Sequence, residues 1–478
     1  MYPKHHFLQL LLVLASFSLS FCTYQNDPFP LHHRRPYHPT NYGGNYYNSG
    51  RAYRRPTFFP GRDNGNYYRP TFFPGRDNGN YYRPESRSNS FGIINSARRA
   101  GSPSTSQPIF NVDDFGARGD GRDDSEAFNE AWNRACSSKQ GAILVPKNRV
   151  YYLKPITFSG PCQSDLTMLI YGTIKASPRR SDYEKDRLHW IKFQDVENLR
   201  VEGGGTINGN GKIWWRNSCK INKALPCKHA PTAVTFHQCN NLRVANLMFK
   251  DAQQMHLTFQ KCLNVLALNL RVIAPGNSPN TDGIHVTDTE NIQIMNSLIK
   301  TGDDCISIVS GSKNVRATDI TCGPGHGISI GSLGADNSED YVSNVFVNRA
   351  RLTGTTNGVR IKTWQGGRGY AKNIKFQNIV MNNVTNPILI DQNYCDQDGP
   401  CEEQSSAVQV SNVIYNNIKG TSASEVAMKF DCSKNYPCGA ISLRNIHLVP
   451  LGYQRVEASC ENVRLDSEGI VSPTCSSL

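Results

Sequence analysis

The 478-residue sequence predicts an all-β protein built as a parallel β-helix, a solenoid in which each coil stacks its strands on those of the next coil. Three observations lead to this fold class. Glycine is abundant, at 39 residues, which is typical of turn-rich proteins and not of helix bundles. Apolar and polar residues alternate in short runs. Two short phrases recur at intervals of about 20 to 50 residues, the period of solenoids.

The first phrase is an Asn followed by an apolar residue. It occurs at Asn198, Asn241, Asn264, Asn291, Asn314, Asn344, Asn373 and Asn412. The shortest interval is 23 residues, from position 241 to 264 and again from 291 to 314. We interpret the longer intervals as one coil with an insertion, or as two coils. Helical stretches between these positions are few, so leucine-rich repeats and helical arrays fit poorly.

The second phrase sets the register of successive coils. It begins at Asp282, Asp304 and His326, which are 22 residues apart, and continues more loosely from 357 and 386. Alternation along the strands places an apolar series inside the solenoid: Ile284, Ile306, Ile328, Val359 and Ile388. The neighbours that face outward are His285, Ser307, Ser329 and Arg360. Equal spacing stacks positions 282, 304 and 326 in one column, with steps of about 4.8 Å.

The start of the repetitive region predicts a cap over one end of the solenoid. Positions 110–112 have the pattern of a short strand. Asp123 is placed to cap a helix, and Glu126 follows it at the spacing of a capping box. The apolar residues that follow fall on one face of that helix: Ala127, Phe128, Ala131, Trp132 and Ala135.

Residues 1–22 read as a secretory signal peptide. Basic residues precede an apolar run of 13 residues, from 7 to 19, and Ser20 and Cys22 suit a cleavage site after Cys22. The run is too short to span a bilayer, and no stop-transfer segment follows it. We therefore expect a secreted protein that makes no membrane contact after the signal is removed.

Residues 23–108 form a tail with a composition of its own. This segment holds 12 Arg, no Lys and four acidic residues, so it carries +8 of the chain's net charge of +13. A 14-residue unit, RPTFFPGRDNGNYY, occurs twice in tandem at 55–68 and 69–82. Two such copies bury no core, and we expect the tail to be disordered. Outside the cell an acidic polysaccharide is its natural partner and a nucleic acid is not expected; a spacer without a specific partner is an equal alternative.

The cysteines agree with secretion. The chain has 15, and removal of Cys22 leaves 14, an even number that suits an oxidising compartment. We prefer pairs that are close in sequence: Cys219–Cys227, Cys305–Cys322, Cys395–Cys401, Cys432–Cys438 and Cys460–Cys475. No CxxC zinc spacing occurs. Asn383, in Asn-Val-Thr, is a candidate glycan site.

A column of titratable side chains points to chemistry, because crowded like charges are costly and the core of a solenoid does not need them. Two carboxyl groups in different environments can divide into an acid and a base, which the cleavage of a glycosidic bond requires. Asp303, beside Asp304, adds a third carboxyl group. Any one of these residues alone is more simply a solvated Asp in a turn, but the whole column with His326 favours catalysis.

Four motifs follow one another within 83 residues: Asn280-Thr281-Asp282, Gly302-Asp303-Asp304, Gly325-His326-Gly327 and Arg360-Ile361-Lys362. In order and spacing they resemble the four signatures of the polygalacturonases, pectin-cleaving glycoside hydrolases with a right-handed parallel β-helix. The resemblance runs from about residue 110 to 478 and is closest to plant members. It does not extend to the tail.

The resemblance implies hydrolysis of α-1,4-galacturonosyl linkages in de-esterified homogalacturonan of the cell wall, by inverting catalysis and with endo action expected. Asp303 would be the general acid, Asp282 and Asp304 would activate the water, and His326 would support the protonation state of the acid. Asn280, from the first signature, would contact the substrate. We expect no metal or cofactor, and a monomer.

Arg360 and Lys362 would bind the carboxylates of the substrate, and the guanidinium fork of an Arg suits such a group. The competing interpretation is a structural ion pair with a nearby Asp. Tyr394 could stack on a sugar ring at the far end of the cleft, although a packed loop Tyr is equally consistent. Trp214 and Trp215 are interpreted as packing residues of a coil.

Other functions remain open from the sequence. Within the hydrolases they are exo action and cleavage of rhamnogalacturonan or xylogalacturonan. A pectate lyase can share the β-helix, but lyases of that kind need calcium and an Arg base, whereas this sequence offers stacked Asp and His residues. A non-catalytic wall-binding protein would have no need of the acid and base residues.

Overall fold

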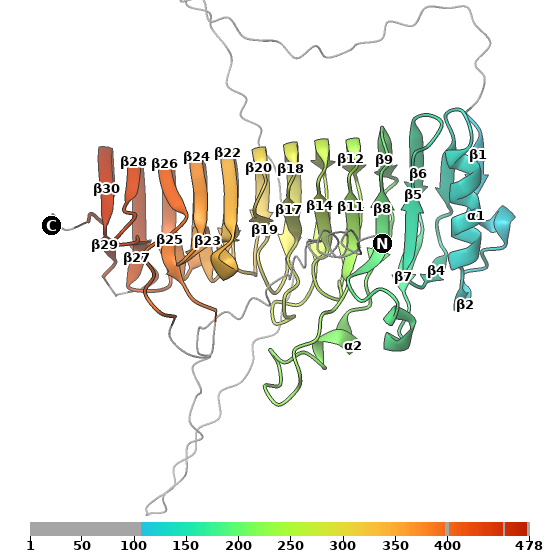
Figure 1. The fold of residues 1–478 in the computed structure, drawn as a ribbon, viewed down its shortest axis with the longest axis horizontal. Helices are drawn as coiled ribbons and strands as arrows, with labels where there is room; N and C mark the ends of the chain where they lie inside the picture. The colour runs from blue at the N-terminus through green and yellow to red at the C-terminus, as the bar shows by residue number, and fades with distance from the viewer. Residues whose placement is uncertain (1–106, 397–400, 453–454, 476–478) are drawn as a thin grey trace, which may run out of the picture. The chain divides into compact units, whose positions relative to one another are not determined.

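The computed structural model describes residues 107–396, 401–452 and 455–475 (Figure 1). The predicted signal peptide and the tandem repeat of the tail lie outside the described residues, so both remain predictions from the sequence. No described helix is long and apolar enough to cross a membrane.

The described strands stack coil after coil along one axis, from the end that carries the helix α1 to β30 (Figure 1). The pairings between them are parallel. In the described chain the larger sheet has 19 strands: β1 (Ile109–Asn111), β2 (Asp120–Asp123), β3 (Ala142–Val145), β4 (Val150–Leu153), β6 (Leu166–Ile170), β7 (Thr173–Ala176), β9 (Leu199–Glu202), β10 (Thr206–Asn208), β12 (Asn240–Ala245), β13 (Met248–Lys250), β15 (Leu263–Leu268), β16 (Arg271–Ile273), β18 (Glu290–Lys300), β20 (Lys313–Cys322), β22 (Glu339–Thr353), β24 (Arg368–Val384), β26 (Gln409–Ser422), β28 (Cys438–Pro450) and β30 (Val463–Ser472).

The smaller sheet of the described chain has 11 strands: β5 (Ile156–Ser159), β8 (His189–Gln194), β11 (Thr232–His237), β14 (Leu257–Gln260), β17 (Ile284–Thr287), β19 (Ile306–Ile308), β21 (Ile328–Leu333), β23 (Asn357–Trp364), β25 (Asn386–Tyr394), β27 (Val426–Asp431) and β29 (Glu457–Glu461). Helical segments are few: α1 (Ser125–Cys136), α2 (Lys212–Trp215), and the 3-10 turns η1 (Val112–Phe115), η2 (Arg180–Tyr183) and η3 (Ala335–Asn337). This is the parallel β-helix that the sequence predicts.

The longer strands of the larger sheet turn a corner of the coil. The first half of β18 pairs with β15 and its second half pairs with β16. Asn296 lies between the two halves with a φ of 48°, in the left-handed region. One sheet therefore supplies two faces of each coil, and the smaller sheet supplies another.

The core lies inside the coils. The five predicted apolar residues, from Ile284 to Ile388, pair in register from coil to coil and are 0% exposed. Phe193, Phe236 and Phe259 stack in the same interior, with ring centroids 4.8 and 5.6 Å apart. Burying one such side chain is worth about 1.5–3 kcal/mol, and this stack repeats the gain on three successive coils.

The recurring Asn phrase has a physical cause in the structure. All eight Asn residues named above adopt φ between 52° and 61°, a left-handed conformation that Asn tolerates better than most residues. The seven from Asn241 to Asn412 each donate the side-chain amide to the amide oxygen of the preceding Asn in this series, over 2.8–3.1 Å. The Asn phrase therefore recurs in the sequence each time the chain returns to the same corner of the solenoid.

The capping helix α1 forms, and its five predicted apolar residues are buried. Its predicted start is wrong by one residue, because Asp124 and not Asp123 is the N-cap and no side chain closes a capping box there. The carboxylate of Asp124 instead accepts backbone N–H groups of the preceding loop and of β4. Asp123 accepts the backbone N–H of Ser125. The carboxylate of Asp124 therefore binds amides of the loop and of β4 and not those of the helix.

All five preferred disulfides are present, and a sixth joins Cys136 to Cys162. The expectation from an even count was incomplete, because in the described chain Cys239 and Cys262 are free and buried. They occupy the same position on adjacent coils, and each thiol faces backbone carbonyl groups.

Candidate active site

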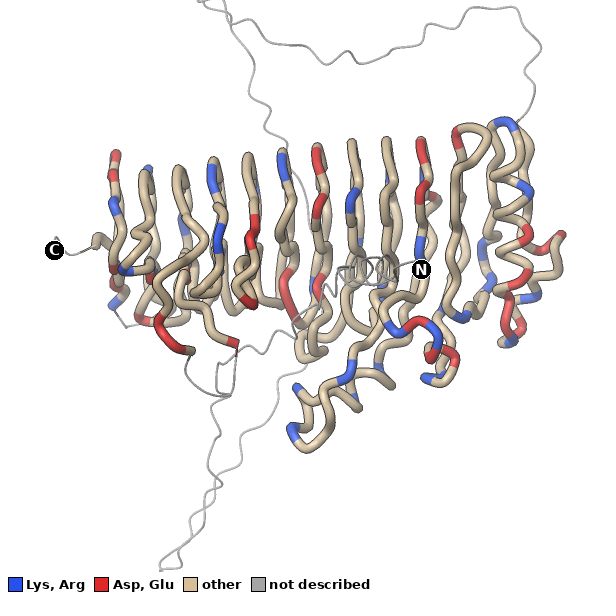
Figure 2. The backbone as a smooth tube through the Cα atoms, viewed as in Figure 1, with Lys and Arg blue, Asp and Glu red and all other residues tan. Residues whose placement is uncertain are grey.

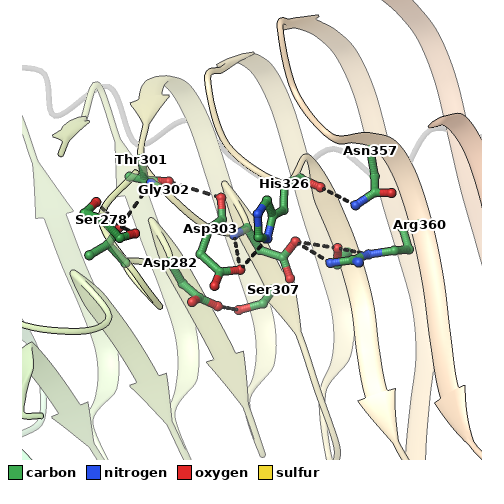
Figure 3. Close-up of polar contacts among 12 residues, drawn as sticks. Ser278, Asp282, Thr301, Gly302, Asp303, Ser307, His326, Asn357 and Arg360 are labelled. Atoms are coloured by element: carbon green, nitrogen blue, oxygen red, sulfur yellow. Dashed lines mark hydrogen bonds and ion pairs between the residues drawn. The ribbon is translucent and has the colours of Figure 1, made fainter. Parts of the chain in front are cut away.

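The predicted column lies where three successive strands of the smaller sheet begin. Asp282 precedes β17, Asp303 and Asp304 precede β19, and His326 precedes β21. Two residues after each of positions 282, 304 and 326, the strand pairs with the strand of the neighbouring coil. The repeating phrase therefore stacks as predicted. Figure 3 shows the side chains of Asp282, Asp303 and His326 gathered in one place, with Arg360 beside them.

Two glycines of the motifs allow the loops to approach this closely. A Cβ atom on Gly302 would lie 2.0 Å from the carbonyl oxygen of Ser278. Gly325 has a φ of 146°, and a Cβ atom there would lie 2.6 Å from the carbonyl oxygen of Asp303. A side chain at either position would push the loops apart, so these glycines are required by the geometry of the column.

Asp303 is held by its two neighbours in the motifs. Its Oδ1 accepts the backbone N–H of Asp304 over 2.8 Å and lies 3.0 Å from Nδ1 of His326. The backbone N–H of His326 also donates to the carbonyl oxygen of Asp303. The side chain of Asp303 is 9% exposed, against 3% for Asp282 and 0% for Asp304. Of the three carboxyl groups, Asp303 is therefore the one a bound sugar reaches most easily.

Asp304 contacts two cations. Arg360 Nη2 lies 3.0 Å from its Oδ1, and Lys362 Nζ lies 3.4 Å from its Oδ2. Ser329 donates to Oδ1 over 2.7 Å and accepts from Arg360 Nε. Both cationic side chains are 2% exposed. The ion pair that the sequence left as an alternative for Arg360 and Lys362 is thus present.

Asp282 has a different environment again. Burial, and then the charges of Asp303 and Asp304, hold the pKa of its carboxyl well above the ordinary value. Lys362 and a hydrogen bond from Ser307 Oγ, 2.9 Å from Oδ2, act in the opposite direction. The three carboxyl groups of the column therefore differ in exposure, partners and charge balance.

Asp303, Asp304 and His326 are the one set in the described chain whose ligand atoms lie close enough to hold a metal, within 4.8 Å of one another. Their atoms already have partners on the protein. Both oxygens of Asp304 face cations, and Oδ1 of Asp303 faces a backbone N–H and a ring nitrogen of His326. A divalent cation here would meet two positive side chains, so the donor set does not fit a metal well.

The remaining predicted residues lie around the column. Asn280 lines a small pocket together with Arg180 and Trp214. Trp214 is buried against the edge of Tyr183, as expected for a packing residue. Tyr394 is 4% exposed and packs against Trp364, with Lys362 Nζ 5.3 Å from its ring centroid. This enclosure favours the packing interpretation of Tyr394 over sugar stacking.

Sequence reasoning did not assign Ser307, Ser329 or His285 to the site. Each occupies the outward position of the second phrase, directly after the apolar residue that faces inward, and the register aligns them in one row with Arg360. That shared position was the available signal. A single outward Ser or His is usually only a solvated residue, so the pattern gains meaning only once its carboxylate partners are known.

Comparison with known proteins identifies the family. Residues 136–475 match the family model described as Glycosyl hydrolases family 28. The chain is 64% identical over 381 residues to polygalacturonase QRT2 of Arabidopsis thaliana, which covers 79% of this chain and 87% of that protein. It is 60% identical over 372 residues to polygalacturonase-2 of Solanum lycopersicum, covering 77% and 81%.

Solved structures agree with this at the level of the fold. The polygalacturonase of Erwinia carotovora superposes with a TM-score of 0.63 at 22% identity, covering 77% of this chain and 99% of that one. The endo-xylogalacturonan hydrolase of Aspergillus tubingensis gives a TM-score of 0.65 at 24% identity, covering 76% and 100%. The chain therefore belongs to glycosyl hydrolases family 28, as a glycoside hydrolase of the plant polygalacturonase type.

Proposed function

We propose that this enzyme hydrolyses α-1,4-galacturonosyl linkages of de-esterified homogalacturonan in the cell wall, with endo action and inversion at the anomeric carbon. The observation that carries the proposal is the division of three adjacent carboxyl groups into three environments. Asp303 contacts His326 and is the most exposed, Asp304 contacts two cations, and Asp282 is buried with a raised pKa. Such a division supplies an acid and a base from residues of one type.

In this mechanism Asp303 donates its proton to the departing glycosidic oxygen, and His326 supports its protonation state. Asp282 takes a proton from the attacking water, and Asp304 helps to orient that water and stabilises the positive charge that develops on the sugar ring. A raised pKa suits a general base, because proton transfer is most efficient when the pKa of the base lies near the working pH.

An acidic polysaccharide suits the charges beside the column. Arg360 and Lys362 place two cations beside the one carboxylate of Asp304. Figure 2 shows further Lys and Arg residues in the loop around α2, and the segment 212–228 holds five basic residues and no acidic one. From residue 109 to 478 the chain has 39 basic and 35 acidic residues, so this local excess differs from the balance of the whole region.

The substrate contacts follow from these positions. Arg360 and Lys362 attract the galacturonate carboxylate while they hold Asp304, and Asn280 contacts the chain from the pocket that it lines. The ring of Tyr394 packs under Nζ of Lys362 as a cation–π partner. We also propose that the enzyme is secreted, acts as a monomer and needs no metal.

The test is a reducing-end assay on polygalacturonate, xylogalacturonan and rhamnogalacturonan, with and without a chelator. We expect polygalacturonate to be the best substrate, with activity unchanged by the chelator. Mixed oligomers as early products, with the opposite anomer at the new reducing end in ¹H NMR, would support endo and inverting action. Unsaturated products that absorb in the ultraviolet would indicate a lyase and contradict the proposal, and release of monomers alone would contradict endo action.

A further inference from the structure

Three side chains form a hydrogen-bonded chain that ends on Asp282. Ser307 Oγ, on β19, lies 2.9 Å from Asp282 Oδ2 and 2.7 Å from Nδ1 of His285, on β17. The direct distance from His285 Nδ1 to Asp282 Oδ2 is longer, at 4.0 Å. His285 and Ser307 are paired residues of adjacent strands, so the sheet itself fixes their separation.

The direction of these hydrogen bonds follows from the number of protons. A hydroxyl group has one proton, and an ionised carboxylate can only accept. When Asp282 is ionised, Ser307 must give its proton to Asp282. The short contact between Ser307 Oγ and His285 is then a hydrogen bond only if Nδ1 of His285 carries a proton and donates it to the hydroxyl oxygen.

We propose that Ser307 and His285 are positioning residues for the catalytic base. Ser307 stabilises the ionised form of Asp282, and His285 fixes the direction in which the hydroxyl group of Ser307 points. The inference rests on the proposed function, in which Asp282 takes the proton from water. It adds to that function the residues that keep Asp282 ionised.

The charges around Asp282 explain why its ionised form needs the hydrogen bond from Ser307. Asp303 and Asp304, from the loop before β19, both disfavour its ionised form, and burial does so more strongly. Lys362, on β23, favours the ionised form but is shared with Asp304. The hydrogen bond from Ser307 is the other favourable contact, and it acts on Asp282 without being divided between two carboxylates.

The two histidines near Asp282 act through hydrogen bonds and not through charge. Burial lowers the pKa of His285 to about 4, so at mildly acidic pH its imidazole is neutral and acts on Asp282 through Ser307. Burial also lowers the pKa of His256, on the preceding coil, to about 4. Its Nδ1 contacts the backbone carbonyl of Asp282, which leaves the carboxylate to Ser307.

The test is the acid limb of the pH profile of kcat/KM on polygalacturonate. Ser307→Ala removes a hydrogen bond to an ionised group, so we expect the limb to move to higher pH by about one unit. His285→Ala should move it in the same direction but less far. His285→Asn restores a donor close to the position of Nδ1, so it should return the limb toward that of the wild type.

Thr258→Val is the matched control. Thr258 occupies the same row one coil before His285, and its hydroxyl group contacts the sulfur of Met255 and not a carboxylate. We expect its acid limb to be unchanged. An equal loss of activity at every pH in Ser307→Ala and His285→Ala, with the limb unmoved, would mean a merely structural role and would overturn the inference. If Ser307→Ala does not fold, the comparison of His285→Ala with His285→Asn decides the question.

Asp282→Asn separates this inference from the proposed function. Full turnover in Asp282→Asn would remove Asp282 as the base and overturn both. An inactive Asp282→Asn with an unmoved acid limb in Ser307→Ala would overturn only the role of Ser307 and His285.

Discussion

Arg360 on β23 lies 3.0 Å from the Oδ1 oxygen of Asp304, which is 56 residues earlier in the chain, before β19. Both side chains are closed off from solvent, at 2% and 0% exposed. Lys362 contacts the other oxygen. The carboxylate of Asp304 is thus fixed from the side of the later coil by two positive charges.

Breaking this pair should destabilise the fold. In Arg360→Met the buried charge of Asp304 loses its closest cation, and removal of one partner of a buried pair costs about 3–5 kcal/mol. Arg349→Met is the matched control, because Arg349 pairs with Asp319 over 2.6 Å at the surface, with side chains 55% and 42% exposed. A surface pair is worth about 0–1 kcal/mol. Urea unfolding followed by circular dichroism measures both, and similar small losses would show that the Asp304 pair contributes little.

Asp303→Asn should remove the proposed proton donor while it keeps the size of the side chain. General acid catalysis contributes about 10²–10⁴-fold, so we expect turnover to fall by about 10²-fold or more with an unchanged melting temperature. Asp319→Asn, whose side chain is exposed and pairs with Arg349, should retain normal turnover. Asp303 would lose its assigned role if the folded variant kept its rate.

Lys362→Ala tests whether Lys362 binds the substrate. If Lys362 attracts the galacturonate carboxylate, the interaction exists before the transition state, so KM should rise more than kcat falls. Added salt should raise the KM of the wild type in the same direction, because it screens the attraction. A normal KM with a lost kcat would mean that Lys362 serves Asp304 alone.

Asp391→Asn should change how stability depends on pH. Burial, and then the neighbouring carboxylate of Asp431, raise the pKa of Asp391 to about 6 from an ordinary value of 3.8. The folded state therefore binds this proton more tightly than the unfolded state. The resulting stability is fully present below about pH 4 and is lost as the pH rises through about 6. We expect Asp391→Asn to melt higher than the wild type at pH 7 and to lose that advantage at pH 4.

Asp319→Asn is the control of opposite sign for this experiment, because the hydrogen bond from Arg349 lowers the pKa of Asp319. Its stabilising contribution is present above the ordinary pKa and is lost as the pH falls. The two variants should therefore show opposite pH trends in melting temperature. Parallel trends would contradict the assigned environment of Asp391.

Deletion of residues 23–104 tests the tail. The segment 23–108 carries a net charge of +8 that is spread over its length. Charge distributed in this way is better suited to binding a polyanion than to forming a compact binding pocket. We expect activity on short oligogalacturonates to be unchanged and retention on pectin-rich walls to fall. The difference should vanish at high salt. Equal wall retention at low salt would make the tail a spacer, and lost activity on short substrates would show that it packs on the β-helix.

Much of the fold could be predicted from the sequence because its signals are local and repeat. The left-handed Asn at one corner of each coil and the apolar residue of each inward position depend on the backbone of a few residues. Each coil repeats the same requirement, so the register of Asp282, Asp304 and His326 follows from equal spacing. The five short-range disulfides follow for the same reason, since their cysteines are close along the chain.

The partners within the column depend on contacts between coils that are far apart in the sequence. Whether Arg360 meets a substrate or Asp304 depends on side-chain directions on coils 56 residues apart, which no local pattern encodes. The same holds for the contact of Ser307 with Asp282, for the bridge from Cys136 to Cys162, and for the enclosure of Tyr394. Equal spacing along the chain is enough to place Asp282, Asp304 and His326 in one column. Burial and neighbouring charge, which exist only in the assembled coils, decided how each one is held and how Asp282 binds its proton.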